Sequence, residues 1–264
     1  MFVAGIDVGS VAAKAVVLEL FPLSPAQPPG IAGTALMPTG WDTAGAGREV
    51  LARACSAAGL SATDVAFTVA TGYGRVALPF ANKSLTEIGC HARGAAHLFP
   101  DAGLVLDIGG QDSKAISLEQ GAVRDFVMND KCAAGTGRFL QVVSGILNLS
   151  LDALGEAAAQ GTAVDISSMC AVFAETEIVG LLAKGTAPAD IAAGVFRSLA
   201  RRMCTLARRL PMRGACVFTG GLANSRAFAD MLARELGCAV HVPQEPQLVG
   251  ALGAALHAMK EAQS

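Results

Sequence analysis

The sequence predicts an α/β protein built from two similar half-domains. Its 264 residues are enough for one large core or two modest ones. Two stretches one hundred residues apart share a skeleton, GIDVGSVAAKAVVLE from Gly5 and VLDIGGQDSKAISLE from Val105. In each, an apolar run leads to an Asp and a Gly-containing turn, and a second β-prone run follows, which is typical of a hairpin with a polar tip. A repeated hairpin indicates that both halves follow one plan.

The first half contains the pattern of a compact α/β unit. Apolar runs, Pro/Gly punctuation and a capping residue before the first helical pattern define its elements. In order we expect a hairpin over 3–20, a Pro/Gly-rich loop over Pro22–Gly30, a strand over Ile31–Pro38, a helix from Asp42 or Thr43 to about Gly59, a strand in DVAFTVATG, and a helix from about Ser84 to Phe99.

The second half repeats the strands and adds helices. We expect strands at 103–108, 113–118 and 122–128, followed by helices in TGRFLQVVSGILNL, LDALGEAAAQ and CAVFAETEIVGLLAKG. An amphipathic helix comes next, with Phe196 and Leu210 on its apolar face. The chain then continues with a strand in ACVFTG, a helix opened by the glycines and Asn224 of GGLANSRAF, and a last helix from about Leu248. The helices between Thr136 and Lys184 have no counterpart in the first half, so the specific function of the protein is expected there.

Composition excludes several classes of protein. The net charge of −2 favours neither nucleic acid nor an anionic membrane as a partner. The N-terminus leads straight into a strand without the pattern of a signal peptide, and no apolar run is long enough to span a bilayer. Seven cysteines without such a signal argue against a disulfide framework. We therefore expect a cytoplasmic protein with reduced thiols.

The two tips predict a nucleotide site. Glycine lets backbone N–H groups approach an anion closely, and a carboxylate can hold a divalent cation. One such tip is also compatible with a plain turn, but two in register, each with a Lys seven residues after its Asp, together with a later TGG turn, favour nucleotide binding. Since GxxxxGK[ST] is absent, the chain is not a P-loop protein.

Two cysteines stand where an anionic ligand would be stabilised. Cys132 precedes the helix expected around Thr136, and Cys170 precedes the helix in AVFAETEIV. A helix N-terminus carries free N–H groups and partial positive charge, which favour a thiolate. Such thiolates are suitable ligands for an iron–sulfur cluster, and a two-fold dimer would bring four of them together. The alternative is that both are small buried side chains.

The remaining cysteines and histidines carry no comparable pattern. Four cysteines fall within apolar helix or strand patterns and are expected to be structural, namely Cys55, Cys204, Cys216 and Cys238. Cys90 beside His91 is a weak metal-site candidate without a second pair. His97, His241 and His257 show no ligand spacing.

The tips resemble the phosphate motifs of the superfamily of actin, sugar kinases and heat-shock ATPases. This resemblance implies two ribonuclease H-like (actin-like ATPase) half-domains with a nucleotide cleft between them, over 1–100 and 101–247, with the helix at 248–264 packing back on the first. It implies that Asp7 holds Mg²⁺ through water and that Ser10 and Lys14 meet the phosphates. The other implied contacts are Gly9, Gly109 and Gly110 as further phosphate-binding glycines, Asp107 and Gln111 near the attacking water, and Gly220, Gly221 and Asn224 at the adenosine.

A more specific resemblance covers nearly the whole chain. GIDVGS, TGYGR, LDIGGQDSK, MNDKCAAGTGRFL, SSMC followed by VFAE, and TGG resemble the ATP-dependent activators (component A) of 2-hydroxyacyl-CoA dehydratases and the ATPase subunits of benzoyl-CoA reductases. The resemblance implies a homodimer sharing one [4Fe-4S] cluster through Cys132 and Cys170 of each subunit. It also implies ATP and ADP as ligands, a ferredoxin or flavodoxin as electron donor, and a dehydratase or reductase as electron acceptor.

Three functions follow as hypotheses. The first is an activase that couples ATP hydrolysis to transfer of one low-potential electron, with ATP changing the angle between the half-domains. The second is a small-molecule kinase of the same fold with structural cysteines. The third is a nucleotide-dependent scaffold or filament subunit.

Overall fold

The computed structural model describes residues 1–20, 29–167 and 170–263. The loop expected at Pro22–Gly30 falls, up to residue 28, outside the described residues. The chain divides into two compact units. The first comprises Met1–Asp101, Glu119–Val123 and Gln247–Ser264, and the second comprises Ala102–Leu118 and Arg124–Pro246.

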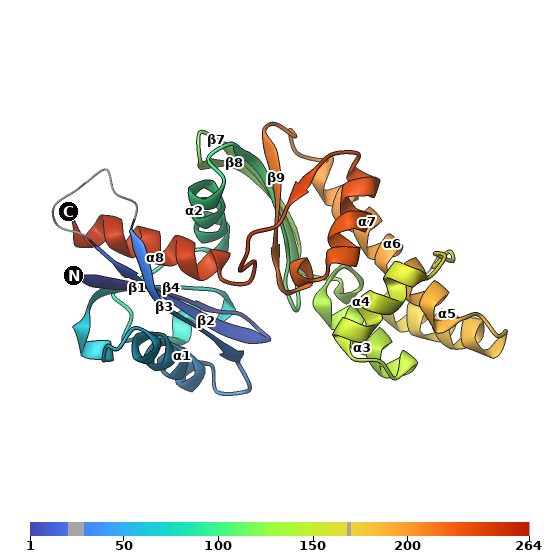
Figure 1. Cartoon of the computed structure of the whole chain (residues 1–264), viewed down its shortest axis with the longest axis horizontal. Coiled ribbons are helices and arrows are strands. Elements are labelled where there is room, and N and C mark those ends of the chain that lie inside the picture. The colour runs from blue at the N-terminus through green and yellow to red at the C-terminus, as the bar shows by residue number, and fades with distance from the viewer. Residues whose placement is uncertain (21–28, 168–169, 264) are drawn as a thin grey trace. The chain divides into compact units, whose positions relative to one another are not determined.

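The first unit is built on a five-stranded sheet in the order β3-β2-β1-β4-β5 (Figure 1). β1 pairs antiparallel with β2 and parallel with β4. The strands are β1 (Phe2–Val8), β2 (Ala12–Glu19), β3 (Gly30–Pro38), β4 (Val65–Thr71) and β5 (Lys83–Ser84), and short 3₁₀ turns lie at Ala62–Asp64 and Tyr73–Ala77. The expected hairpin is therefore present, with its tip between Val8 and Ala12.

Helices cover both faces of this first sheet. α1 (Thr43–Ala57) contacts β2 and β3, whereas α8 (Val249–Ala262) contacts β1 and β4 and packs beside α2 (Glu87–Leu98). Side chains on β1 alternate between two cores, with Ile6 on the α1 side and Val3 on the α8 side. A Cβ at Gly5 would lie 2.1 Å from the Ala251 carbonyl oxygen, so only glycine lets α8 approach this closely.

The second unit repeats the strand order, β10-β9-β6-β7-β8. Its strands are β6 (Ala102–Ile108), β7 (Ser113–Glu119), β8 (Ala122–Asn129), β9 (Ala215–Gly220) and β10 (Val240–His241). β6 pairs antiparallel with β7 and parallel with β9, as β1 does with β2 and β4. The two sheets thus share one topology, which confirms the α/β class and the internal duplication.

Five helices gather on one side of the second sheet (Figure 1). They are α3 (Gly137–Leu147), α4 (Leu151–Gln160), α5 (Ala171–Ala183), α6 (Pro188–Ala207) and α7 (Arg226–Leu236). Their core centres on three rings, because Phe228 packs edge-on against Phe196 and at a tilt against Phe218. No single helix among the described residues is long and apolar enough to cross a bilayer, although α3 and α4, bent by 81°, pass that test as a pair.

Several expectations need correction. The helix expected from Ser84 begins at Glu87, because Ser84 belongs to the edge strand β5. Asn224 does not open α7: residues Gly221–Asn224 form a 3₁₀ turn, and the Ser225 side chain caps the helix by accepting from the Phe228 N–H. Cys238 is exposed in the segment between α7 and β10 rather than inside an apolar element.

Candidate functional site

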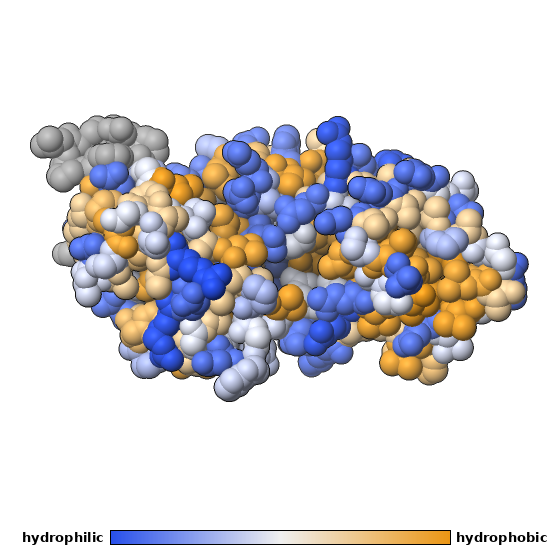
Figure 2. Space-filling view, turned by 60° about the horizontal axis from the view of Figure 1, so that its bottom comes forward, coloured by the Kyte–Doolittle hydropathy of each residue, from blue (hydrophilic) through white to orange (hydrophobic). Residues whose placement is uncertain are grey.

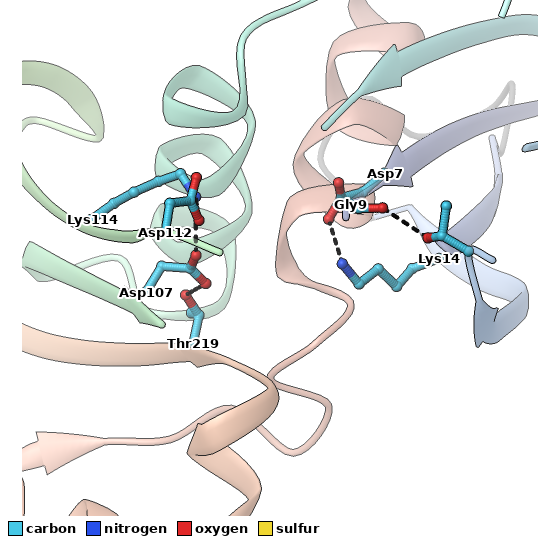
Figure 3. A network of polar contacts seen from close by, with 8 residues as sticks. Asp7, Gly9, Lys14, Asp107, Asp112, Lys114 and Thr219 are labelled. Carbon is cyan, nitrogen blue, oxygen red and sulfur yellow. Dashed lines mark hydrogen bonds and ion pairs between the residues drawn. The ribbon is translucent and has the colours of Figure 1, made fainter. Parts of the chain in front are cut away.

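The tip of the first unit is a turn closed by main-chain and side-chain hydrogen bonds. The Gly9 N–H donates to the Ala12 carbonyl over 3.0 Å, and the Thr39 hydroxyl donates to the Gly9 carbonyl over 2.8 Å. Asp7 and Lys14 face each other across the β1–β2 ladder, and Lys14 Nζ lies 3.1 Å from Asp7 Oδ2 (Figure 3). The hairpin register therefore holds a buried carboxylate beside an ammonium group.

A second strand end encloses the Asp7 carboxylate. Thr71 is the register partner of Asp7 on β4, and Gly72 follows with a φ of +84°. A Cβ at Gly72 would lie 2.4 Å from Asp7 Oδ1, so this position needs glycine for both backbone conformation and space. A Cβ at Gly250, at the start of α8, would likewise lie 3.0 Å from Asp7 Oδ2 and 2.9 Å from His91 Nε2.

The tip of the second unit repeats this frame with a different charge pattern. The Gly109 N–H donates to the Asp112 carbonyl over 2.9 Å, as Gly9 does to Ala12. Lys114 is the register partner of Asp107, and its Nζ lies 2.7 Å from Asp112 Oδ1 and 3.5 Å from Asp107 Oδ2 (Figure 3). The Thr219 hydroxyl donates to Asp107 Oδ1 over 2.9 Å. This lysine is held between two carboxylates.

The TGG turn has an unexpected counterpart in the first unit. Thr219 pairs with Asp107, and Gly220 follows with a φ of +90°, just as Gly72 follows Thr71. A Cβ at Gly220 would lie 2.9 Å from Asp107 Oδ1. The Thr-Gly pair of TGYGR is therefore the structural equivalent of that of TGG. The sequence signal for this equivalence is the Thr-Gly dipeptide that follows a strand in both halves. Two shared residues do not establish the equivalence until the strand register is known.

The other residues predicted at the nucleotide differ in their exposure. Ser10 is half-buried within the first turn, and Gln111 is exposed in the second. Gly220 donates its N–H to the Pro246 carbonyl over 3.1 Å. Gly221 and Asn224, which follow this second Thr-Gly turn, are exposed. Gly110, in the turn after β6, is half-buried.

The loop that carries Cys132 is held by the side chain of Asn129. Asn129 Nδ2 donates to the Cys132 carbonyl over 2.8 Å, and the Cys132 N–H donates to Asn129 Oδ1 over 3.2 Å. Cys132 precedes a single 3₁₀ turn (Ala133–Gly135) instead of lying directly at the α3 terminus. Thr136, fully buried, donates its hydroxyl to the Ala133 carbonyl and links that turn to α3. Cys132 itself is half-buried.

Cys170 lies directly at a helix start, as the sequence predicts. It is the exposed N-cap residue of α5, and its carbonyl accepts from the Ala174 N–H over 2.9 Å. Three residues earlier, the backbone N–H and the hydroxyl of Ser167 both donate to Glu177 Oε1 over 2.9 Å. A side chain of α5 therefore anchors Ser167.

The buried cysteines are poorly suited to bind a metal. Burial raises the pKa of Cys90 to about 12, that of Cys204 to about 11 and that of Cys216 to about 12. Such thiols stay protonated at neutral pH and are poor metal ligands. Burial also raises the pKa of Cys55. Cys132 and Cys170 therefore stay the ligand candidates, with the exposed Cys238 as a third accessible thiol.

The metal-type donors in the described parts of the chain do not form a complete site, since no three His, Cys, Asp or Glu side chains come together there. Near Cys170, α5 exposes apolar side chains, since Val172, Phe173 and Val179 are each more than half exposed. Figure 2 shows apolar surface gathered over the helical part of the second unit, at the right of the view.

Comparisons with known proteins match almost the entire chain. Residues 4–258 match the BadF/BadG/BcrA/BcrD ATPase family. The chain is 42% identical to the (R)-2-hydroxyglutaryl-CoA dehydratase activating ATPase of Acidaminococcus fermentans, over 99% of this chain and 98% of that protein.

Solved structures agree with the fold. The activator of 2-hydroxyisocaproyl-CoA dehydratase from Clostridium difficile, with bound ADPNP, superposes with a TM-score of 0.92 at 38% identity, covering 100% of this chain and 96% of that one. A ROK hexokinase from Thermus thermophilus, 15% identical with a TM-score of 0.53 over 100% and 99% of the two chains, shares the sugar-kinase fold alone. By its sequence match and its fold, the chain belongs to the BadF/BadG/BcrA/BcrD ATPase family.

Proposed function

We propose that this protein is an ATP-hydrolysing activase that carries an iron–sulfur cluster and delivers a low-potential electron to a partner, a 2-hydroxyacyl-CoA dehydratase or a related acyl-CoA reductase. Membership of an ATPase family supports the hydrolysis, and the relatives named as dehydratase activators support the role. The observation that carries the proposal is that an ATPase frame holds two reduced thiols in accessible positions, Cys132 and Cys170.

The proposed nucleotide roles are those that the resemblance to actin-like ATPases implies, and the chemistry of the two tips supports them. Asp7 holds Mg²⁺ through water, and Ser10 with Lys14 binds phosphate oxygens. Gly110 supplies a backbone N–H group, whereas the Gly9 and Gly109 N–H groups close their own turns and these two glycines serve to let the backbone approach the phosphates closely. Gly220, Gly221 and Asn224 contact the adenosine. Asp107 and Gln111 orient the attacking water. Phosphoryl transfer requires mainly positioning and neutralisation of charge, which these groups provide.

The cluster roles follow from the donor set. Cys132 and Cys170 fit half of a four-thiolate site, so a second copy of the chain completes it. The exposed apolar side chains of α5 support such a homodimer, because a patch of this kind beside a ligand is typical of an interface. When bound, a [4Fe-4S] cluster accepts one electron and releases it again. The proposed donor is a ferredoxin or flavodoxin in the cytoplasm.

Coupling requires that ATP and ADP favour different states of the protein. ATP must bind the docking-competent state more tightly than ADP does, since equal affinities shift no equilibrium. The dehydratase or reductase then receives the electron only from the ATP state. An ADP-bound dimer that bound its partner as tightly as the ATP-bound dimer would contradict this coupling.

Anaerobic expression tests the proposal directly. The purified protein should be brown and contain about four iron atoms per dimer, as one [4Fe-4S] cluster requires. Cys132→Ala and Cys170→Ala should each lose the iron, whereas Cys238→Ala, which changes another exposed cysteine of the same unit, should retain it. A colourless wild-type protein would contradict the activase; ATP turnover that depends on an added small-molecule acceptor would favour the kinase instead.

A further inference from the structure

The turn at the second tip is bonded to the helix that follows Cys132. The Gly137 N–H donates to the Gly109 carbonyl, and the Arg138 N–H donates to the Gly110 carbonyl, each over 2.9 Å. These are the first two N–H groups of α3, which have no partner within the helix itself. The turn therefore caps the helix.

Peptide planarity gives these two bonds a consequence for phosphate binding. In a trans peptide the carbonyl and the following N–H point in opposite directions. Since the Gly109 and Gly110 carbonyls point to α3, the N–H groups of Gly110 and Gln111 point away from it. The Gly110 N–H is one of the groups that the proposed site offers to phosphate, and the Gln111 N–H follows it on the same side. The two peptide units thus bond α3 through their carbonyls and direct their N–H groups to the side proposed for phosphate.

The path from α3 to Cys132 is short and closely packed. Thr136 and Ala134 are fully buried, and the Gly135 N–H donates to the Cys132 carbonyl over 3.4 Å. A Cβ at Gly135 would lie 2.7 Å from Asn129 Nδ2, so the turn is pressed against the side chain that clamps Cys132. A shift of the α3 start cannot be absorbed by slack in this segment and reaches Cys132.

We propose that the Gly109–Gly110 turn transmits the nucleotide state to Cys132 through its two carbonyl hydrogen bonds to the start of α3. The inference rests on the proposed function, because it assumes that phosphate binds at this turn. It places one coupling path inside the second unit, so that this path needs no change in the angle between the half-domains. Among the described residues no bond of this kind links the turn to Cys170, and Cys170 is predicted to respond less.

The test compares two substitutions of one residue in the full-length protein. Arg138→Pro removes the N–H that bonds Gly110, at a first-turn position where a helix tolerates proline. Arg138→Ala keeps that N–H and removes only the side-chain contact with Gln141. Alkylation rates of Cys132 and Cys170 in cluster-free protein are measured by mass spectrometry with Mg-ADP and with a non-hydrolysable ATP analogue. In cluster-containing protein, the electron paramagnetic resonance spectrum of the reduced cluster is recorded for the same two nucleotide states.

In wild type and Arg138→Ala, the alkylation rate of Cys132 should differ between the two nucleotides by about fivefold, the factor that one hydrogen bond contributes. In Arg138→Pro this difference should vanish while both nucleotides still bind, and the nucleotide-dependent change in the resonance spectrum should vanish with it. Undiminished nucleotide dependence in Arg138→Pro would overturn the inference.

A second variant covers the case in which Arg138→Pro fails to fold. Gly137→Ala keeps both N–H groups but places a methyl group 3.2 Å from the Gly109 carbonyl oxygen, and it should reduce the nucleotide dependence of Cys132. An unchanged dependence in Gly137→Ala would then contradict the inference. If wild type binds no cluster, the proposed electron transfer fails, but the alkylation comparison still decides whether the turn controls Cys132.

Discussion

The two hairpin tips share one backbone frame but differ in the ion pairs that their lysines form. Both have an Asp paired in register with a Lys, and both end beside a Thr-Gly strand terminus with a positive φ at glycine. The position after the turn is Ala12 in the first tip and Asp112 in the second. As a result, Lys14 pairs with the Asp7 carboxylate and its side chain is 15% exposed, whereas Lys114 lies between two carboxylates and its side chain is 3% exposed.

This difference separates the roles of the two lysines. The charge of Lys114 is balanced by Asp107 and Asp112, so it serves to hold the second tip together. Among the described residues Lys14 is paired with Asp7, and it retains exposure, so it can present positive charge to a phosphate. We therefore propose that one duplicated frame provides a ligand-binding lysine in one unit and a structural lysine in the other.

Removing each lysine gives the largest expected effect. Lys114→Ala leaves two carboxylates without their central cation and should lower the free energy of unfolding by about 3 kcal/mol, the cost of breaking a buried ion pair. Lys14→Ala should cost at least about 1 kcal/mol less, because one carboxylate loses its partner instead of two. Urea unfolding of both variants measures this. Equal losses would remove the distinction between the tips.

Neutralising the carboxylate of the first tip should act on activity more than on stability. Asp7→Asn should reduce kcat for ATP hydrolysis by about a hundredfold, since it removes one electrostatic contribution to the transition state. Steady-state hydrolysis with Mg-ATP checks this, with Asp230→Asn, an exposed change on α7, as the control. Activity within twofold of wild type would exclude Asp7 from the magnesium site.

Copying the second tip into the first sharpens the comparison. Ala12→Asp places a carboxylate where Asp112 stands relative to Lys114, and it should weaken ATP binding about tenfold by competing for Lys14. Isothermal titration calorimetry with the ATP analogue measures the dissociation constant. Ala12→Asn adds nearly the same volume at the same position without the charge and is the control. Unchanged affinity would mean that Lys14 does not bind phosphate.

The smallest effect concerns the cores, in which the two units are alike. Burial raises the pKa of Cys90 in the first unit and of Cys216 in the second from 9.0 to about 12. Both thiols stay protonated in the folded state while the unfolded chain ionises, so the stability they contribute is complete below pH 9 and is lost as the pH rises to about 12. At pH 10 each of the two buried thiols should lower the free energy of unfolding by about 1 kcal/mol.

Urea unfolding under reducing conditions at pH 8 and pH 10 measures this loss. Cys90→Ala and Cys216→Ala should each show a smaller loss between the two pH values than wild type. A wild-type stability that does not fall over this interval would show that the buried thiols ionise as readily in the folded protein as in the unfolded chain.

Local pattern was sufficient for the hairpins because their information lies within a few residues. Apolar runs, an Asp-Gly turn and β-branched residues predicted the tips around Asp7 and Asp107, and the position of Cys170 before a helix followed from the apolar pattern of α5. The same reasoning placed Asn224 at a helix start, where Ser225 is the capping residue, because a 3₁₀ turn intervenes and local propensity does not distinguish the two.

Contacts between distant segments could not be predicted in this way. Thr71 and Gly72 lie beside Asp7 only because β4 pairs with β1, and the Asn129 clamp on Cys132 depends on how β8 ends. The bonds from α3 to the Gly109–Gly110 turn join residues almost thirty positions apart. No periodicity in the sequence encodes such pairs.

The sequence by itself determined the α/β class, the duplication, the nucleotide tips and the two cysteines that stand before helices, since each depends on residue type and near spacing. Only the tertiary structure decided which lysine is held between two carboxylates and which turn caps the helix after Cys132. The physical reason is that a charge or an N–H group acquires its role from its neighbours in space, and strand register and helix docking bring those neighbours together.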